Sequence, residues 1–279
     1  MFNASFWRRG AVFLRLAALV VMAVPMHRAW SQDTAPELFA YRSGELGLKG
    51  FVWKPAGPGP FPAILWNHGS EKRPGTVDTV APYFVSRGYV FLVPHRRGQG
   101  RSPGPYIIDQ LNQAERTQRS RMLVALNELH LQDQLAALDY LKRLSYVDHT
   151  RIVVMGASFG GIQTILAAER GAGYRAAIDC SGAAETWNGS PDMQARLTDA
   201  ARRATIPVFF LQAENDYDLT PNRVLSEAIK NAGKFAQTKI YPAFGSGAQG
   251  REGHGFCWRG TDIWGPDVLR FIESNLSPQ

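Results

Sequence analysis

RIVVMGASFGG, residues 151–161, is the stretch of sequence that decides the fold. An apolar, β-branched run leads into a G-x-S-x-G arrangement, and a helical pattern follows it, which predicts a strand, a sharp turn and a helix. Ser158 then lies at a strained backbone position, where side chains at Gly156 and Gly160 would collide with neighbouring backbone. Such a turn lifts the serine hydroxyl above the sheet edge and aims backbone N–H groups at a developing negative charge. The stretch therefore predicts a nucleophilic serine.

Short apolar runs alternate with helical patterns on both sides of this turn. The sequence predicts strands at residues 38–41, 46–53, 63–67, 89–94, 151–155, 176–180, 207–212 and 238–241. It predicts helices at residues 77–87, 129–144, 160–169, 192–202, 221–232 and 263–275. The first two strands should pair antiparallel, and the alternation predicts a mostly parallel eight-stranded sheet with helices on both faces. The polar stretch 104–127 is either a partly helical insertion beside the site or a solvated helix face.

A serine hydroxyl becomes a good nucleophile only when a base takes its proton, and in this type of fold the base follows the serine in the chain. Of the six histidines, only His254 follows Ser158, in the segment GREGHGF between the last strand and the last helix. His254 is therefore the predicted base, with a surface-loop histidine as the alternative.

The acid that orients the base is expected after the strand at 207–212, where the loop reads AENDYDLTP. Its carboxylates are Glu214, Asp216 and Asp218. We favour Asp216, because the chain needs a few residues to turn before a carboxylate can reach the histidine, and Asp218 is the second choice. Asp179, at the end of an earlier strand, is a weaker candidate and is expected to be a structural hydrogen-bond acceptor.

Two backbone N–H groups are expected to bind the negatively charged oxygen of the transition state. One is the N–H of Phe159, directly after the serine, and the other is the N–H of Ser70 in the loop NHGSEK, with that of Glu71 as the alternative. His68 in this loop is expected to fix the loop rather than to act as a base.

Two tryptophans are candidates for the walls of the substrate pocket. Trp187 follows the strand at 176–180, and Trp258 lies four residues past His254, although aromatic residues at such places are as often packing residues. The stretch at 182–205 is too short for a large lid, which favours an open cleft and small or soluble substrates.

Composition excludes several classes of protein. The chain has 279 residues, 45% of them hydrophobic and 20% charged, which excludes a disordered chain and a disulfide-dense mini-protein. The net charge is +7, but the first 31 residues hold four basic and no acidic side chains, so the remainder has 27 basic against 24 acidic residues, a net charge of +3. The basic residues form no stripe, so nucleic acid is not an expected partner.

Residues 1–31 have the pattern of a secretory signal peptide. A pair of arginines precedes an apolar run at 11–24, and small residues at Ala29 and Ser31 predict cleavage after Ser31, with an uncleaved membrane anchor as the alternative. The expected location is periplasmic or secreted, and residues 32–279 are expected to form a single domain without a stable membrane span. Two buried thiols are the default interpretation of Cys180 and Cys257, and a disulfide between them, which an oxidising compartment permits, is the alternative.

No metal or organic cofactor is expected, because the chain has neither an H-x-x-x-H pair nor a set of cysteine ligands. The expected partner is a small-molecule ester or peptide substrate, and the oligomeric state is left open.

Together, NHGS, HRRGQGRS, VDHTRIVVMGASFGG, the AEND loop and GHG resemble the dienelactone hydrolase branch of the α/β-hydrolase superfamily. The chain is also similar to the catalytic domain of prolyl-oligopeptidase-like peptidases, from about Leu46 to Leu276. The resemblance implies an α/β-hydrolase fold and acyl transfer through a Ser-His-Asp triad. True dienelactone hydrolases use a cysteine nucleophile, and Ser158 in its place favours a serine esterase. The alternatives are a secreted serine peptidase and a non-catalytic binding protein with the same fold.

Overall fold

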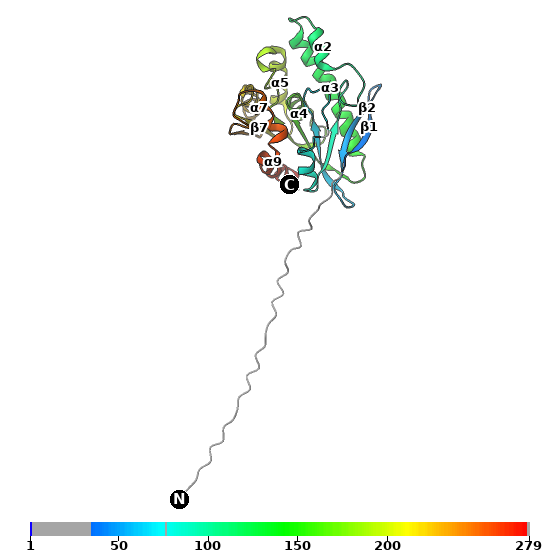
Figure 1. Cartoon of the computed structure of the whole chain (residues 1–279), viewed down its shortest axis with the longest axis vertical. Coiled ribbons are helices and arrows are strands. Elements are labelled where there is room, and N and C mark those ends of the chain that lie inside the picture. Colours follow the sequence, from blue (N-terminus) through cyan, green and yellow to red (C-terminus); the bar gives the residue numbers. More distant parts are fainter. Residues whose placement is uncertain (2–34, 76, 278–279) are drawn as a thin grey trace. The chain divides into compact units, whose positions relative to one another are not determined.

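A mixed β-sheet forms the centre of the fold (Figure 1). The structure is a computed structural model and describes Met1 and residues 35–75 and 77–277. Within these residues the strands are β1 (Glu37–Ser43), β2 (Leu46–Trp53), β3 (Phe61–Asn67), β4 (Val90–Pro94), β5 (Val147–Ala157), β6 (Tyr174–Cys180), β7 (Val208–Ala213) and β8 (Ala236–Tyr241). They form one eight-stranded sheet in the order β1-β2-β4-β3-β5-β6-β7-β8.

Strand direction follows the prediction. β1 pairs antiparallel with β2, and β2 pairs antiparallel with β4, whereas every pair from β4 through β3 to β8 is parallel. The carboxyl ends of the parallel strands therefore share one edge of the sheet, and the loops that follow β3, β5, β6 and β7 meet there.

Helices cover both faces of the sheet. In the described residues they are α1 (Val80–Val85), α2 (Ile107–Gln113), α3 (Arg119–Lys142), α4 (Phe159–Arg170), α5 (Pro191–Arg203), α6 (Thr220–Asn231), α7 (Arg251–His254), α8 (Phe256–Arg259) and α9 (Thr261–Leu276), with a 3₁₀ turn at Trp187–Gly189. Neighbouring residues of a strand point to opposite faces. Ile152 and Val154 of β5 thus join the hydrophobic cluster under α3–α6, while Val153 and Met155 join the cluster under α1, α8 and α9.

The polar stretch 104–127 is mostly helical. It contains α2 and the first turns of α3, which begins at Arg119 rather than at the predicted residue 129. The reason is a narrow apolar stripe, because Leu123 and Leu126 are buried at a helical spacing while most residues around them are exposed or half-buried.

Cys180 and Cys257 form a disulfide, with their Cα atoms 5.8 Å apart. Of the two alternatives that the sequence left open, the structure therefore has the paired one. The bond joins the end of β6 to α8 across 77 positions of sequence, and both residues are fully buried.

The predicted signal peptide and its cleavage position fall outside the residues whose structure is described, apart from Met1. Within the described residues, none of the helices combines the length and the apolar character that a bilayer crossing requires.

Candidate active site

Ser158 occupies the turn between β5 and α4 with φ +58° and ψ −118°, a conformation that residues with side chains rarely adopt. The two glycines of the motif make this turn possible. A Cβ atom on Gly160 would overlap the main-chain carbonyl of Asn67 in β3, and one on Gly156 would overlap the carbonyl of Gly160. The Ser158 N–H donates to the carbonyl of Cys180 at 3.0 Å, which ties the turn to β6.

Phe159 is the first residue of α4, so its N–H has no acceptor within the helix and lies at the positive end of the helix dipole. This is the arrangement that the sequence predicted for the first donor to a negatively charged oxygen.

The loop after β3 carries the second predicted donor, the N–H of Ser70, and the side chain of Arg96 binds this loop. This arginine is almost fully buried, and its Nη2 donates to the carbonyls of His68 and Gly69 at 2.8 and 2.7 Å. Burial lowers the pKa of Arg96 to about 10, so the guanidinium remains charged at neutral pH. The N–H and C=O of a trans peptide point in opposite directions. Because the Gly69 carbonyl faces Arg96, the N–H of Ser70 points away from the buried guanidinium.

His68 is fully buried, and its Nδ1 lies 3.0 Å from Nη2 of Arg96. Burial, together with the charge of Arg96, holds the pKa of His68 well below its usual value, so the ring is neutral. Its place inside the loop agrees with the expected loop-fixing role.

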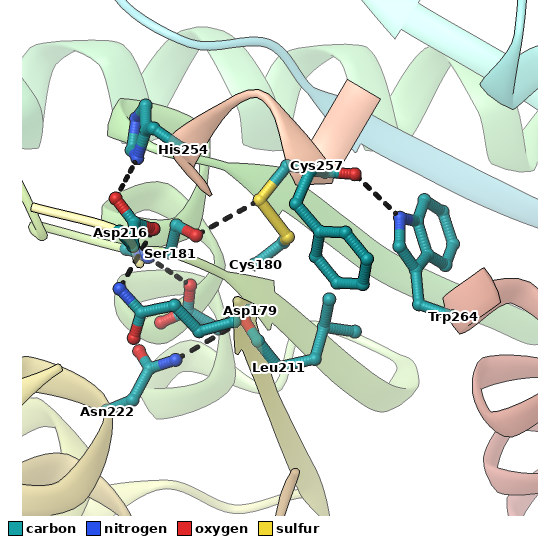
Figure 2. Close-up of a disulfide and its surroundings, with 12 residues drawn as sticks. Asp179, Cys180, Ser181, Leu211, Asp216, Asn222, His254, Cys257 and Trp264 are labelled. Atoms are coloured by element: carbon teal, nitrogen blue, oxygen red, sulfur yellow. Dashed lines mark hydrogen bonds and ion pairs between the residues drawn. A yellow bond between two sulfur atoms is a disulfide. The ribbon is translucent and has the colours of Figure 1, made fainter. Parts of the chain in front are cut away.

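The structure brings His254 and Asp216 together. Nδ1 of His254 lies 2.8 Å from Oδ1 of Asp216, and the aspartate is fully buried (Figure 2). Asp216 also accepts hydrogen bonds from the Tyr217 N–H at 2.6 Å and from Nε2 of Gln212 at 2.9 Å, which fix the carboxylate in place.

The other two carboxylates of this loop have structural partners. Asp218 accepts the N–H of Thr220 at 2.8 Å, at the start of α6, and Glu214 accepts the N–H of Ala243 at 3.1 Å. Asp179 accepts the N–H of Gly182 at 2.8 Å, as expected for a structural acceptor.

His254 is the last residue of the short helix α7, which lies in the glycine-rich segment between the last strand and the last helix. With its Nδ1–H donated to Asp216, the other ring nitrogen, Nε2, carries the free lone pair. Among the described residues Nε2 has no hydrogen-bond partner. The rings of Tyr217 and Trp258 flank the imidazole, with centroids 5.3 and 5.6 Å away, which limits its rotation.

A cleft of about 590 Å³ opens beside His254. Its lining residues are Ser70, Glu71, Tyr217, Arg251, His254, Gly255, Trp258 and Arg259. Trp258 and Ser70 thus lie where the sequence predicted them. Trp187 does not line this cleft; its side chain is buried in the hydrophobic cluster under α3–α6, so the prediction that it forms a pocket wall is not supported.

Sequence reasoning missed four side chains of the cleft, of which two are cationic, one is acidic and one is aromatic. They are Arg251, Arg259, the carboxyl group of Glu71, and Tyr217. Each lies within a few residues of a predicted site residue, which is the signal that could have identified them. The pKa of Glu71 is raised above its usual value because burial outweighs the opposite effects of backbone hydrogen bonds and of the nearby Arg96. Within the described part of the chain, no group of three or more His, Cys, Asp or Glu side chains could hold a metal ion.

Comparison with solved structures gives the same fold. The chain superposes on the acylaminoacyl peptidase of Pyrococcus horikoshii with a TM-score of 0.65 and 20% identity, over 86% of this chain and 41% of that one. It superposes on dipeptidyl peptidase 4 of Porphyromonas gingivalis with a TM-score of 0.65 and 20% identity, over 87% and 36% of the two chains. The chain therefore spans about two fifths of the length of these peptidases.

A match over the full length of the other chain is found with Est1E of Butyrivibrio proteoclasticus, solved with ferulic acid bound. Its TM-score is 0.60 at 16% identity, over 83% of this chain and 99% of that one. No curated protein matches the sequence. The model of the dienelactone hydrolase family matches residues 48–262, most of the described chain. The chain belongs to the dienelactone hydrolase family and has the α/β-hydrolase fold.

Proposed function

We propose that this protein is a secreted carboxylic ester hydrolase in which Ser158, His254 and Asp216 form a catalytic triad. The observation that carries the proposal is the 2.8 Å hydrogen bond between His254 and Asp216, which leaves Nε2 of the histidine without a partner at the wall of an open cleft. A neutral histidine with a free Nε2 is the form that can accept a proton from a serine hydroxyl.

In the proposed reaction the Ser158 hydroxyl attacks the ester carbonyl while its proton passes to Nε2 of His254. Catalytic hydrogen bonds commonly tighten only in the substrate complex, so we propose that the hydroxyl closes onto Nε2 when the substrate binds. The Asp216 carboxylate stabilises the imidazolium that forms. The N–H groups of Phe159 and Ser70 bind the oxygen that becomes negatively charged.

His254 then gives its proton to the leaving alcohol, and the carbon–oxygen bond of the ester breaks to leave an acyl group on Ser158. A water molecule, deprotonated by the same histidine, hydrolyses this acyl-enzyme and restores the serine hydroxyl.

Two features of the structure support the proposed compartment and the proposed class of substrate. The buried disulfide between Cys180 and Cys257 is typical of an oxidising compartment, in line with the expected signal peptide. The cleft is open, and no large covering element lines it among the residues whose structure is described, which favours small or soluble esters over long-chain lipids.

The test compares hydrolysis of p-nitrophenyl acetate with that of the matched amide, p-nitroacetanilide. We expect the wild-type protein to cleave the ester much faster than the amide, and Ser158→Ala to abolish the cleavage. Faster cleavage of acyl-peptide amides than of matched esters would favour the serine peptidase alternative. A folded wild-type protein with no activity on either class, and with the same behaviour as Ser158→Ala, would favour a binding protein.

A further inference from the structure

The disulfide joins the two segments that carry the proposed nucleophile and base. On one side, Cys180 ends β6 beside the serine turn and lies opposite Ala157 of β5 in the sheet register. Its carbonyl accepts the N–H of Ser158 at 3.0 Å. The backbone of Cys180 therefore holds the residue whose hydroxyl is to react.

On the other side, Cys257 lies three residues after His254, about one helical turn along the α7–α8 segment (Figure 2). Consecutive turns of this segment are hydrogen-bonded, since Gly255 donates to the carbonyl of Arg251 at 3.1 Å and accepts from Trp258 at 3.2 Å. A displacement of Cys257 would therefore be passed to the histidine.

Several contacts hold His254 to the loop that carries its acid. Nδ1 binds Asp216, the N–H of Gly250 donates to the carbonyl of Asn215 at 2.7 Å, and Gly253 lies so close to the Asn215 backbone that a side chain there would overlap it. These contacts fix the histidine relative to Asp216, and through that loop the histidine is connected to the serine strand indirectly, by way of β7 and β6.

The link to the serine side is covalent. The S–S bond holds the two cysteine Cα atoms 5.8 Å apart, and the Ser181 hydroxyl, next in sequence after Cys180, lies 3.2 Å from Sγ of Cys257. Because a disulfide sulfur carries no hydrogen, the hydroxyl is the donor in this contact. Nε2 of His254, which faces the serine side in the proposed mechanism, makes no hydrogen bond of its own among the described residues.

We propose that the Cys180–Cys257 disulfide is a positioning element of the active site, which sets the approach of His254 to Ser158. The inference rests on the proposed function. Both cysteines are fully buried in the cluster under α1, α8 and α9, so the bond acts as a fixed link rather than as a surface group open to exchange. Displacements of about 1 Å between reacting groups can lower a rate about 100-fold.

The test is the double variant Cys180→Ala/Cys257→Ala, with Cys180→Ala/Cys257→Val as a second variant that refills part of the lost volume. Each is assayed with p-nitrophenyl acetate at a temperature at which unfolding curves show it to be folded. We expect kcat to fall about 10- to 100-fold while KM stays within about twofold, because the histidine is misplaced and the cleft is unchanged. The low-field proton resonance of the His254–Asp216 hydrogen bond should persist, because its own contacts remain.

The matched control is Leu225→Ala, a fully buried position in α6 on the other side of the sheet. It should lower stability without changing kcat of the folded protein, which separates loss of stability from loss of positioning. The proposal is overturned if the disulfide-free variants keep wild-type kcat when folded, or if no disulfide-free form folds, because the bond then serves stability alone. A wild-type protein that cleaves no ester overturns the proposed function instead, and this inference with it.

Discussion

Asp179 is a buried carboxyl group whose charge should make the stability of this protein depend on pH. Burial raises its pKa from the usual 3.8 to about 7, although the hydrogen bond from the Gly182 N–H acts in the opposite direction. One of its oxygens has no hydrogen-bond partner among the described residues. The carboxyl is therefore protonated in the folded state at pH values where it is ionised in the unfolded chain.

The sign and size of the effect follow from this difference. Below about pH 4 both states bind the proton, and stability is unaffected. Between pH 4 and pH 7 the unfolded state loses its proton while the folded state keeps it, so the free energy of unfolding falls as pH rises. At about 1.4 kcal/mol for each pKa unit, a pKa that rises from 3.8 to about 7 costs about 4 kcal/mol above pH 7.

The perturbation is Asp179→Asn, which removes the ionisable group and keeps the shape of the side chain. An asparagine amide can add a constant cost at this buried position, so the informative quantity is the difference between variant and wild type at two pH values. Urea unfolding at pH 4 and pH 8 should show that this difference moves in favour of the variant by about 4 kcal/mol. Other titrating groups are common to both proteins and cancel.

Asp148 provides the control, because the hydroxyl and N–H of Thr150 lower its pKa. Asp148→Asn should give a small pH-dependent difference of the opposite sign. If the curves of Asp179→Asn and wild type stay parallel from pH 4 to pH 8, Asp179 is ionised in the folded protein and the reasoning is refuted.

Three further predictions concern the site and its supports. Asp216→Asn should lower kcat/KM for ester hydrolysis by about 10³- to 10⁴-fold, because the base loses its orienting carboxylate, whereas Asp218→Asn should change it less than about tenfold; equal effects in steady-state kinetics would contradict the assignment. Gly160→Ala should abolish esterase activity even in any fraction that circular dichroism shows to be folded, because the new Cβ overlaps the main chain of β3. Replacing Cys180 and Cys257 with alanine should lower the free energy of unfolding by about 4.5 kcal/mol, from the loop entropy of a 77-residue separation, and a loss below about 1 kcal/mol in guanidinium unfolding would contradict this.

The serine turn could be predicted from sequence because its requirements are local. Ser158, Gly156 and Gly160 lie within five residues, and the steric conflict that demands glycine arises from the turn itself and the adjacent strand. The parallel direction of the strands around it was predictable as well, since strands that alternate with helices form a mostly parallel sheet.

The choice between Asp216 and Asp218 rested on loop length, but a second signal was present in the sequence. Asp218 precedes Thr220 and Pro221, and an aspartate shortly before a proline is typical of the start of a helix. The structure shows this role, because Asp218 accepts the Thr220 N–H at the start of α6.

The disulfide could not be predicted, because it depends on where two segments 77 positions apart meet in space. The start of α3 was missed because Leu123 and Leu126 form a narrow buried stripe in a stretch whose average is polar. Trp187 was placed on the pocket wall from its position after β6 alone, and nothing local in sequence distinguishes a tryptophan in a wall from one in a core.

The central claim is that Ser158 is a nucleophile activated by His254. The most direct measurement is the intact mass of the protein after treatment with a fluorophosphonate, followed by peptide mapping, because the reagent reports an activated serine without knowledge of the substrate. We predict a single adduct on Ser158 that is absent from Ser158→Ala and lost or greatly slowed in His254→Ala. A folded wild-type protein that forms no adduct, or one labelled equally well without the histidine, would contradict the account.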